Sequence, residues 1–473
     1  MFRLLHLTHF RSWAALAVWL VIASASRSQD ETGLRYADGT ALWREAIPVP
    51  LPEVTSPSGL SLEQLEQRAL ASNPSIQRLS ALVGAARGNT LQVGLRPNPS
   101  IGYEGQQLGS GGLAEQHGVL FSQEIVRGGK LRLNRAVADR ERMRIEQELA
   151  AQELRVLTDV RIAFYQALLA QRQIDLTAEL INISENGSQT VDQLFHANEV
   201  GRADVLQAQL ESENARILSE NARNRHDAAW RSLAAVVGDA TLPPQPLNGD
   251  AESQAEVLDF QQSLTRLLEL SPEISAAAME VERARLALER ARVEPTPNVN
   301  VQGLVNWQDN GIGGKPDGGV AVSIPVPLFN RNQGAIARAE HEVVAARQAL
   351  AETELDLQNR LAPIFEQYAN ARNQVERYRK IILPAAEEAL ALTRTTYSAG
   401  ETNYTSLLTA QRTYSQTRLN HLDAVRILRI AEVEIKGLLL RGSLQSAAGG
   451  EKRDDRTPSN GSQPLGGLEL FDK

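Results

Sequence analysis

The chain has 473 residues, of which 42% are hydrophobic and 5% aromatic, and its formal net charge is -8 at pH 7. This mildly acidic balance predicts that nucleic acid is not a partner, because a polyanion binds basic surfaces. Cysteine is absent, so we expect no disulfide, no thiolate metal site and no lipid-modified N-terminal cysteine.

Residues 1–25 have the pattern of a signal peptide. Arg3 and Arg11 precede an apolar run over 14–22, and Ala23-Ser24-Ala25 has the small-x-small form of a cleavage site. The run is too short to cross about 30 Å of hydrocarbon as a helix, which favours export over a membrane anchor. Residues 26–58 contain four prolines and are predicted to form an extended segment.

The rest of the chain contains an internal duplication. Pro74, Pro97 and Pro99 recur as Pro272, Pro295 and Pro297 at one constant offset, and residues 195–209 are echoed by 397–411. We predict a first structural repeat at 59–240, a linker at 241–256 and a second repeat at 257–440. The polar, Gly-rich residues 441–473 are predicted to be a disordered C-terminal tail.

Each repeat is predicted to contain an opening helix, a β-hairpin and a long helical hairpin. The helices are expected at about 61–94, 130–195 and 203–237, and again at about 257–293, 332–396 and 404–440. The long helical hairpins are therefore 130–237 and 331–440. Proline is absent from 130–195, and a helix of that length is on the order of 100 Å long and needs coiled-coil packing. Pro363 and Pro384 are expected to bend its second counterpart.

The β-hairpins are predicted at 99–126 and 297–327, each around a Gly-rich turn. Strands of about 10 residues suit a tilted bilayer crossing, and Trp307 and Phe329 lie near opposite ends, as interface anchors do. Polar residues such as Glu104, Gln123 and Glu124 interrupt the first hairpin. A soluble hairpin packed on a core is the alternative. In the second hairpin the predicted membrane-facing residues alternate with polar ones: Val299, Val301, Val305, Trp307, Val320, Val322, Ile324 and Val326.

Four strands cannot close a barrel, and an open sheet edge in lipid leaves unmet hydrogen bonds. Three copies would supply about 12 strands and leave a lumen, whereas two copies would pack nearly shut. The predicted fold class is therefore mainly α with a small β part. In it, the duplicated unit forms an α-helical barrel that is continued by a trimeric 12-stranded transmembrane β-barrel.

Several motifs resemble those of the outer membrane efflux proteins, the TolC-like channels of Gram-negative exporters. They are Pro97-Asn98-Pro99, Pro295-Thr296-Pro297, the run from Phe121 to Gly128-Gly129-Lys130, and the run from Val322 to Pro327-Leu328-Phe329-Asn330-Arg331-Asn332. The last two are most similar to the cobalt-zinc-cadmium and copper-silver branch. The resemblance implies a passive homotrimeric duct in the outer membrane, with most of its mass in the periplasm. It also implies a periplasmic adaptor (membrane fusion) protein, an inner-membrane pump of the resistance-nodulation-division type, and heavy-metal cations as cargo.

The turns between the long helices, 198–206 and 399–408, are predicted to form the periplasmic tips that dock on the adaptor. Many relatives carry an aspartate near the place of Ser406, which leaves Asp204 as the acidic candidate for the entrance. As bare helix-hairpin turns these segments would need no function. The candidate docking residues are Gly201, Arg202, Asp204, Val205, Leu206, Gly400, Thr402, Asn403, Tyr404, Leu407 and Leu408.

Enzyme signatures fail, so we predict no catalytic residue, no cofactor and no resident metal. His341-Glu342 lacks the second histidine of a zinc protease because Ala345 stands there, and Gly129-Lys130 lacks the flanking residues of a phosphate loop. Channels for type I polypeptide secretion or drug efflux share the predicted architecture and stay open as alternatives. A soluble periplasmic coiled-coil scaffold is the alternative from another class.

Overall fold

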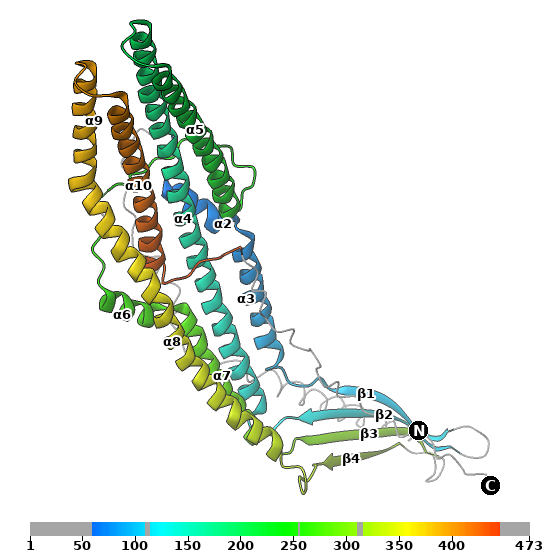
Figure 1. Cartoon of the computed structure of the whole chain (residues 1–473). Coiled ribbons are helices and arrows are strands. Elements are labelled where there is room, and N and C mark those ends of the chain that lie inside the picture. Colours follow the sequence, from blue (N-terminus) through cyan, green and yellow to red (C-terminus); the bar gives the residue numbers. More distant parts are fainter. Residues whose placement is uncertain (1–58, 109–113, 254–255, 310–315, 445–473) are drawn as a thin grey trace, which may run out of the picture. The chain divides into compact units, whose positions relative to one another are not determined.

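The structure, a computed structural model, describes residues 59–108, 114–253, 256–309 and 316–444. The predicted signal peptide, the extended segment up to residue 58 and nearly all of the predicted tail lie outside the described residues. All described elements belong to one unit, Pro57–Lys473. In chain order they are α2 (Leu62–Ser72), α3 (Pro74–Gln92), β1 (Ser100–Leu108), β2 (Ala114–Ile125), α4 (Lys130–His196), α5 (Arg202–Val237), α6 (Phe260–Leu270), α7 (Pro272–Val293), β3 (Val299–Asp309), β4 (Asp317–Ser323), α8 (Gln333–Arg377), the π-helical turn η2 (Tyr378–Ile382), α9 (Leu383–Ser398) and α10 (Tyr404–Lys436) (Figure 1).

The helix α4 runs through 67 residues without a break, which confirms the predicted long helix. It contacts α3 and α7 along its first part and α5 and α10 along its second part. On the far side of α7 and α10, α8 packs against both of these helices, and α9 packs against α10. Across these contacts α3 and α5 lie on one side of the helical layer, and α8 and α9 lie on the other.

The predicted opening helices are wrong in one respect, because each is broken into two. Asn73 ends α2 and caps α3, and Ser271 ends α6 and caps α7. Both residues have extended backbone angles, and each side chain accepts a hydrogen bond from an amide two residues on, at 2.9 Å for Ser75 and 3.2 Å for Glu273. A proline at the first helical position follows each cap, and its fixed φ suits that position. Asn73-Pro74 and Ser271-Pro272 therefore each start a new capped helix, within a stretch that the sequence pattern predicted as one helix.

Prolines in the second long helix act differently from each other. The helix α8 continues through Pro363, whereas the helix changes to η2 directly before Pro384. There the Leu383 amide bonds to the Tyr378 carbonyl five residues back. The α-helix is thus interrupted just before Pro384 and runs unbroken through Pro363, and the expected bends themselves stay predictions.

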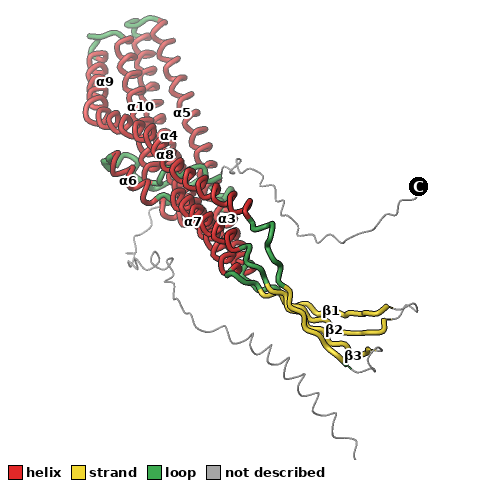
Figure 2. The backbone as a smooth tube through the Cα atoms, turned by 90° about the horizontal axis from the view of Figure 1, so that it is seen from below, coloured by secondary structure: helices red, strands yellow, loops and turns green. Residues whose placement is uncertain are grey.

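A four-stranded antiparallel sheet has the order β1-β2-β3-β4, so β1 and β4 form its edges. Loops join every strand to its helix (Figure 2). The sheet ends earlier than the sequence predicts, because β4 stops at Ser323 and leaves Ile324 and Val326 outside the ladder. Pro325 and Pro327 have no amide hydrogen for a ladder bond, and this ends the strand.

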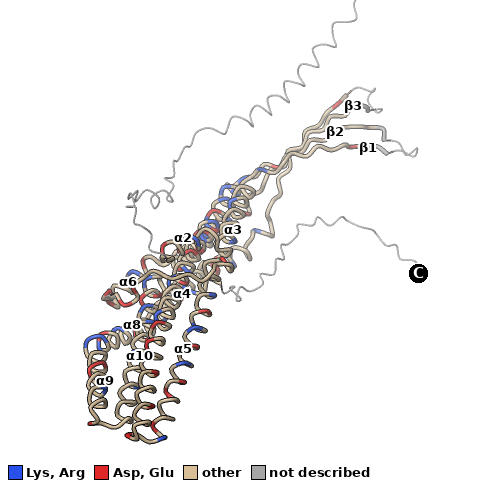
Figure 3. Tube along the Cα trace, turned by 90° about the horizontal axis from the view of Figure 1, so that it is seen from above, with Lys and Arg blue, Asp and Glu red and all other residues tan. Residues whose placement is uncertain are grey.

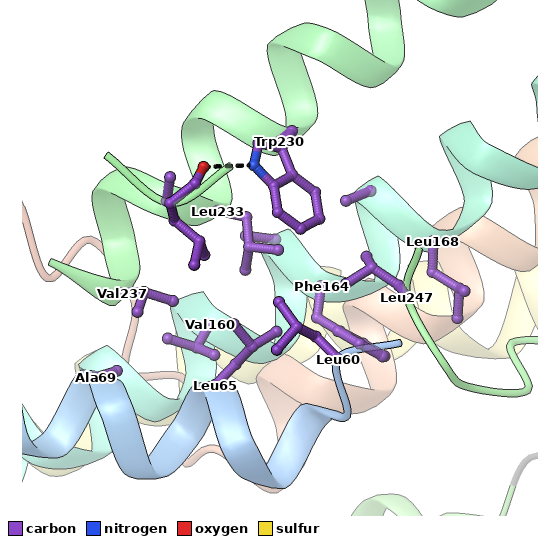
Figure 4. Packing of buried hydrophobic residues seen from close by; sticks show 14 of the residues in the cluster. Leu60, Leu65, Ala69, Val160, Phe164, Leu168, Trp230, Leu233, Val237 and Leu247 are labelled. Carbon is purple, nitrogen blue, oxygen red and sulfur yellow. Dashed lines mark hydrogen bonds between the residues drawn. The ribbon is translucent and has the colours of Figure 1, made fainter. Parts of the chain in front are cut away.

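The largest apolar cluster packs α2, α4 and α5 together with the segment that follows α5. Leu65, Val160 and Leu233 are fully buried in it (Figure 4). Trp230 fills its upper part and donates its indole N–H to the Leu242 carbonyl at 3.0 Å. This bond satisfies the polar end of the buried indole and holds the start of the predicted linker against α5.

Candidate functional site

The sheet has one apolar and one polar face, and the strand register decides which residues share each face. Ile101 lies opposite Phe121, Phe121 opposite Gly303, and Val301 opposite Val322. Alternation along each strand then defines the apolar sheet face. It consists of Ile101, Tyr103, Val119, Phe121, Ile125, Val299, Val301, Val305, Trp307, Val320 and Val322.

Most of this apolar sheet face is open to its surroundings. Exposure ranges from 40% for Phe121 to 80% for Val320, and only Val299 and Val301 are half-buried. The other face carries Glu104, Ser122, Glu124, Asn300, Gln302, Asn306 and Asp317, with Leu120 and Leu304 among them. A sheet lying on a protein core would bury its apolar face, whereas this one exposes it.

The sequence analysis placed both hairpins in the barrel but named apolar-face residues in the second hairpin alone. The structure adds Ile101, Tyr103, Val119, Phe121 and Ile125 to the six predicted residues that the strands retain. Their period of two was present in the sequence. Glu104 and Glu124 only seemed to interrupt it, because the register places both on the polar face. Gln123 is a polar residue on the apolar side, and its amide donates to the Pro97 carbonyl at 3.0 Å.

An aromatic group lies on the apolar sheet face near a β-bulge at His117 and Gly118. The Tyr103 ring lies 6.0 Å from the His117 ring and 6.4 Å from the Trp307 ring. The Tyr103 hydroxyl and His117 Nδ1 are 2.5 Å apart and share a hydrogen bond. Rings with a polar edge of this kind suit a boundary between an apolar and an aqueous layer.

The two predicted tips lie at the other end of α4 from the sheet and pack against each other. Seven buried side chains form this tip core: Val191, Val205, Ala208, Tyr397, Tyr404, Leu407 and Leu408. Burial in it raises the pKa of Tyr404 to about 12, with the Glu211 carboxylate as the next cause. Burial, and then the charge of Asp204, also raises the pKa of Tyr397, whose hydroxyl has no hydrogen-bond partner among the described residues.

This packing corrects part of the predicted docking surface. Val205, Tyr404, Leu407 and Leu408 are at most 5% exposed and hold the two hairpins together, so they offer no surface to a partner. Asp204 and Thr402 are half-buried. The exposed candidates are Gly201, Arg202, Leu206, Gly400 and Asn403.

The tip glycines do not serve a close approach of helices within the chain. A Cβ at Gly400 would meet no atom within 4 Å, and one at Gly201 would meet only the Asp204 carboxylate at 3.8 Å. Gly400 instead has a φ of +76°, and Asn198 occupies the matching place of the first tip with a φ of +64°. Both follow a helix end at which the next amide bonds back at 2.9 Å, Glu199 to Leu194 and Glu401 to Thr396. The duplication therefore extends to the backbone of the turns.

The capping bonds of the tips also bear on the predicted acidic entrance. Asp204 accepts a hydrogen bond from the Gly201 amide at 3.1 Å, and at the second tip Asn403 accepts one from the Ser406 amide at 3.0 Å. Asp204 thus caps its own helix.

Within the described ranges, no group of three or more His, Asp or Glu side chains is placed to hold a metal ion. Likewise, none of the described helices is long and apolar enough to span a membrane.

Comparison with known proteins gives the class. The family model for the outer membrane efflux protein family matches the chain twice, over residues 65–239 and 264–439. The chain therefore belongs to the outer membrane efflux protein family, and its mostly helical fold with a small antiparallel sheet is that of TolC-like channels.

Among individual relatives, the chain is 25% identical over 381 residues to the cobalt-zinc-cadmium resistance protein CzcC of Cupriavidus metallidurans. That alignment covers 80% of this chain and 88% of CzcC. The fold is similar to that of CusC, with a TM-score of 0.69, 18% identity and coverage of 84% of this chain and 98% of CusC. It is also similar to the outer membrane protein VceC of Vibrio cholerae, with a TM-score of 0.66, 17% identity and coverage of 80% and 96%.

Proposed function

We propose that the chain is the outer membrane channel of a tripartite efflux system. Three copies form a passive duct, in which a 12-stranded β-barrel crosses the outer membrane and the helices of the two repeats, 59–240 and 257–440, continue it as a tube in the periplasm. Heavy-metal cations reach this duct from an inner-membrane pump of the resistance-nodulation-division type through a periplasmic adaptor. The sheet, with one exposed apolar face and two free edges, carries the proposal.

The free edges of the sheet suit closure by further copies. Because β1 and β4 run in opposite directions in a four-stranded antiparallel sheet, β4 of one copy meets β1 of the next in an antiparallel pair. Repeating this contact gives a closed barrel in which every edge is paired. The apolar sheet face then meets lipid and the polar face lines the lumen. Three copies supply the 12 strands that leave an open channel.

The helices support the same closure. On the described helices, every exposed large apolar side chain belongs to α2, α3, α5, α8, η2, α9 or the end of α6, and none belongs to α4, α7 or α10. Of these helices, α3 and α5 form one side of the helical layer, and α8 and α9 form the other side. Leu206, Leu210 and Ile217 make one such stripe along α5. The stripes are what a neighbouring copy would cover, since water-exposed apolar stripes favour association.

The cargo and the partners are inferred from the relatives and from the tips. CzcC is a cobalt-zinc-cadmium resistance protein, and this likeness favours divalent metal cations as cargo. The adaptor is assigned to the tips through their exposed residues Gly201, Arg202, Leu206, Gly400 and Asn403.

Cysteine pairs at the two sheet edges test the closure, because the natural chain has no cysteine. Gly102→Cys in β1 is combined in turn with Gly319→Cys, Ala321→Cys and Ser323→Cys in β4, which all lie on the polar face. A Cβ at Gly102 or Gly319 meets no atom within 4 Å. After oxidation in membranes, at least one pair should give a covalent trimer on a non-reducing gel.

The matched control combines Gly102→Cys with Val320→Cys, which points to the apolar face and should not cross-link. Exclusively monomeric bands from all three polar-face pairs, or equal cross-linking by the control, would refute the shared barrel. The cargo is tested separately in a deletion strain scored against zinc, cobalt, cadmium, copper and drugs. Sensitivity to drugs without sensitivity to metals would reject the metal assignment and leave the channel intact.

A further inference from the structure

The π-helical turn η2 separates α8 from α9 and is loosely packed (Figure 1). None of its residues is buried. In the first repeat, the corresponding stretch lies inside the unbroken helix α4, at the offset that relates 195–209 to 397–411. There Leu176 and Leu180 are both buried. Because π-helical turns are rare and occur frequently at functional sites, this difference between the repeats suggests a role for the second one.

The turn η2 contacts α10, and His421 of α10 lies at this contact. The Tyr378 ring of η2 is 6.0 Å from the His421 ring. His421 is 7% exposed, and its Nδ1 has no hydrogen-bond partner among the described residues. At the same offset, the corresponding residue of α5 is Ser219, which is also buried. The first repeat therefore has no titratable side chain at this position.

Basic residues gather where α8 gives way to α9 (Figure 3). Burial is the main cause that lowers the pKa of His421, and Arg418 of α10 and Arg379 of η2 act in the same direction. The Glu252 carboxylate, which precedes α6, opposes them. The helices α4 and α8 also pack against α10, but no charged group described on either contributes to this shift. His421 is therefore neutral near pH 7 while η2 is packed against it.

Protonation favours any conformation in which His421 reaches water, because the charged imidazole is costly in a buried place beside two guanidinium groups. The contact with η2 is the least costly one to open, since η2 has no buried side chain to expose. We propose that His421 and η2 form an acid-sensitive latch, in which protonation of His421 releases η2 from α10 and loosens α9.

The helix α9 leads from η2 to the second tip, so the latch acts on the packing between them. Directly beyond η2, Ala386 of α9 lies in a buried cluster with Leu176 and Leu180 of α4 and Tyr414 of α10. This cluster should open first when η2 is released. Resting on the proposed channel, the latch would loosen the second helical hairpin at the periplasmic end of the duct in acid. The first hairpin, built on the unbroken α4, would keep its packing.

Cysteine labelling measures this opening, because the natural chain has no cysteine. Ala386→Cys reports on α9, where the residue is 9% exposed. Ser184→Cys is the matched control, because Ser184 is 7% exposed and occupies the corresponding place on α4. The full-length protein is labelled with dithiodipyridine at about pH 7.5 and about pH 5.5, under conditions in which the rate follows the open population. Each rate is divided by that of N-acetylcysteine in the same buffer, which removes the pH dependence of the thiol itself.

The normalised rate of Ala386→Cys should rise in acid by up to about ten-fold, the limit for one group whose pKa in water is about 6.5. Ser184→Cys should change by less than about two-fold over the same range. A histidine with a purely structural role would instead weaken the whole chain in acid, and the two cysteines would respond equally. An equal response, or no acid response at Ala386→Cys, would overturn the latch.

Two further variants assign the response to the imidazole. His421→Gln keeps a polar side chain of similar size, and His421→Ser introduces the residue of the first repeat. Either variant should abolish the acid response of Ala386→Cys, and a response that persists in both would overturn the latch. Labelling needs no pore, so it tests the latch even in a chain that forms no channel. Absence of conductance in lipid bilayers would reject the proposed channel and leave the labelling result unchanged.

Discussion

Replacing Arg429 by methionine should release the segment between the two repeats from α10. The Arg429 side chain is 5% exposed and donates to the Ala251 carbonyl at 2.8 Å and to both the carbonyl and the hydroxyl of Ser253. It also pairs with Glu432 at 2.8 Å. One guanidinium group thus joins α10 to the residues that link the repeats.

The size of the effect follows from what the substitution leaves behind. Breaking a buried ion pair costs about 3–5 kcal/mol when one charge stays uncompensated. Glu432 keeps Lys436 as a second partner at 2.8 Å, so the lower end of that range applies to it. Leaving the carbonyls of Ala251 and Ser253 unbonded costs about 1–3 kcal/mol each where they stay buried. We therefore expect a loss of about 3 kcal/mol, since methionine retains the packing of the stem.

Urea unfolding followed by Trp230 fluorescence measures the loss, and hydrogen exchange of the amides at 247–253 shows where it arises. Arg426→Met, one turn earlier, is the matched control. Arg426 is 39% exposed and pairs with exposed Asp423, so its loss should cost under about 1 kcal/mol. If the two variants differ by less than about 1 kcal/mol, or if exchange at 247–253 is unchanged in Arg429→Met, the inferred role of Arg429 is wrong.

Three further predictions concern the helix breaks, a buried histidine and the tips. Asn73→Ala should destabilise by about 2–4 kcal/mol, because it removes a helix cap and a 2.8 Å bond to the Val236 carbonyl, whereas Ser271→Ala loses only a cap worth about 1 kcal/mol. His421→Phe should flatten the fall in unfolding midpoint between about pH 7.5 and 5.5. Gly400→Asn should be tolerated, whereas Gly400→Val should cost about 1–2 kcal/mol of strain at its positive φ.

The direction of the pH effect follows from the burial of His421. Burial lowers the pKa of this residue, with Arg418 of α10 and Arg379 of η2 acting in the same direction and Glu252 opposing them. Its Nδ1 has no hydrogen-bond partner among the described residues. Below the unfolded-state pKa of about 6.5, His421 of the unfolded chain binds a proton that the native state does not bind. The free energy of unfolding therefore falls as pH falls, until the lowered native pKa is reached.

Separate measurements decide these cases. Equal urea midpoints for the Asn73→Ala and Ser271→Ala variants would show that the bond to Val236 contributes nothing. An unchanged pH slope in His421→Phe would assign the acid sensitivity to other groups. Equal thermal midpoints for the asparagine and valine variants at position 400 would contradict the backbone argument, since Asn198 already adopts the same conformation in the first repeat.

The sequence was sufficient wherever a local signal determined the structure. Absence of proline over 130–195 and a regular apolar seam predicted α4, because helix continuity depends on neighbouring residues. The duplicated prolines predicted two similar units, and the family's motifs gave its identity. The second hairpin was recognisable because its apolar and polar residues alternate almost without exception.

The tertiary structure decided what depends on residues far apart in the chain. Only the pairing of β1 with β2 and of β2 with β3 shows that Glu104 and Glu124 share the polar face, so that the first hairpin belongs to the apolar surface as well. Only the meeting of the two tips shows that Tyr404 and Leu408 are buried. Periodicity gives the faces of one element, but strand register and helix packing, which are set by burial over long sequence separations, decide which faces meet.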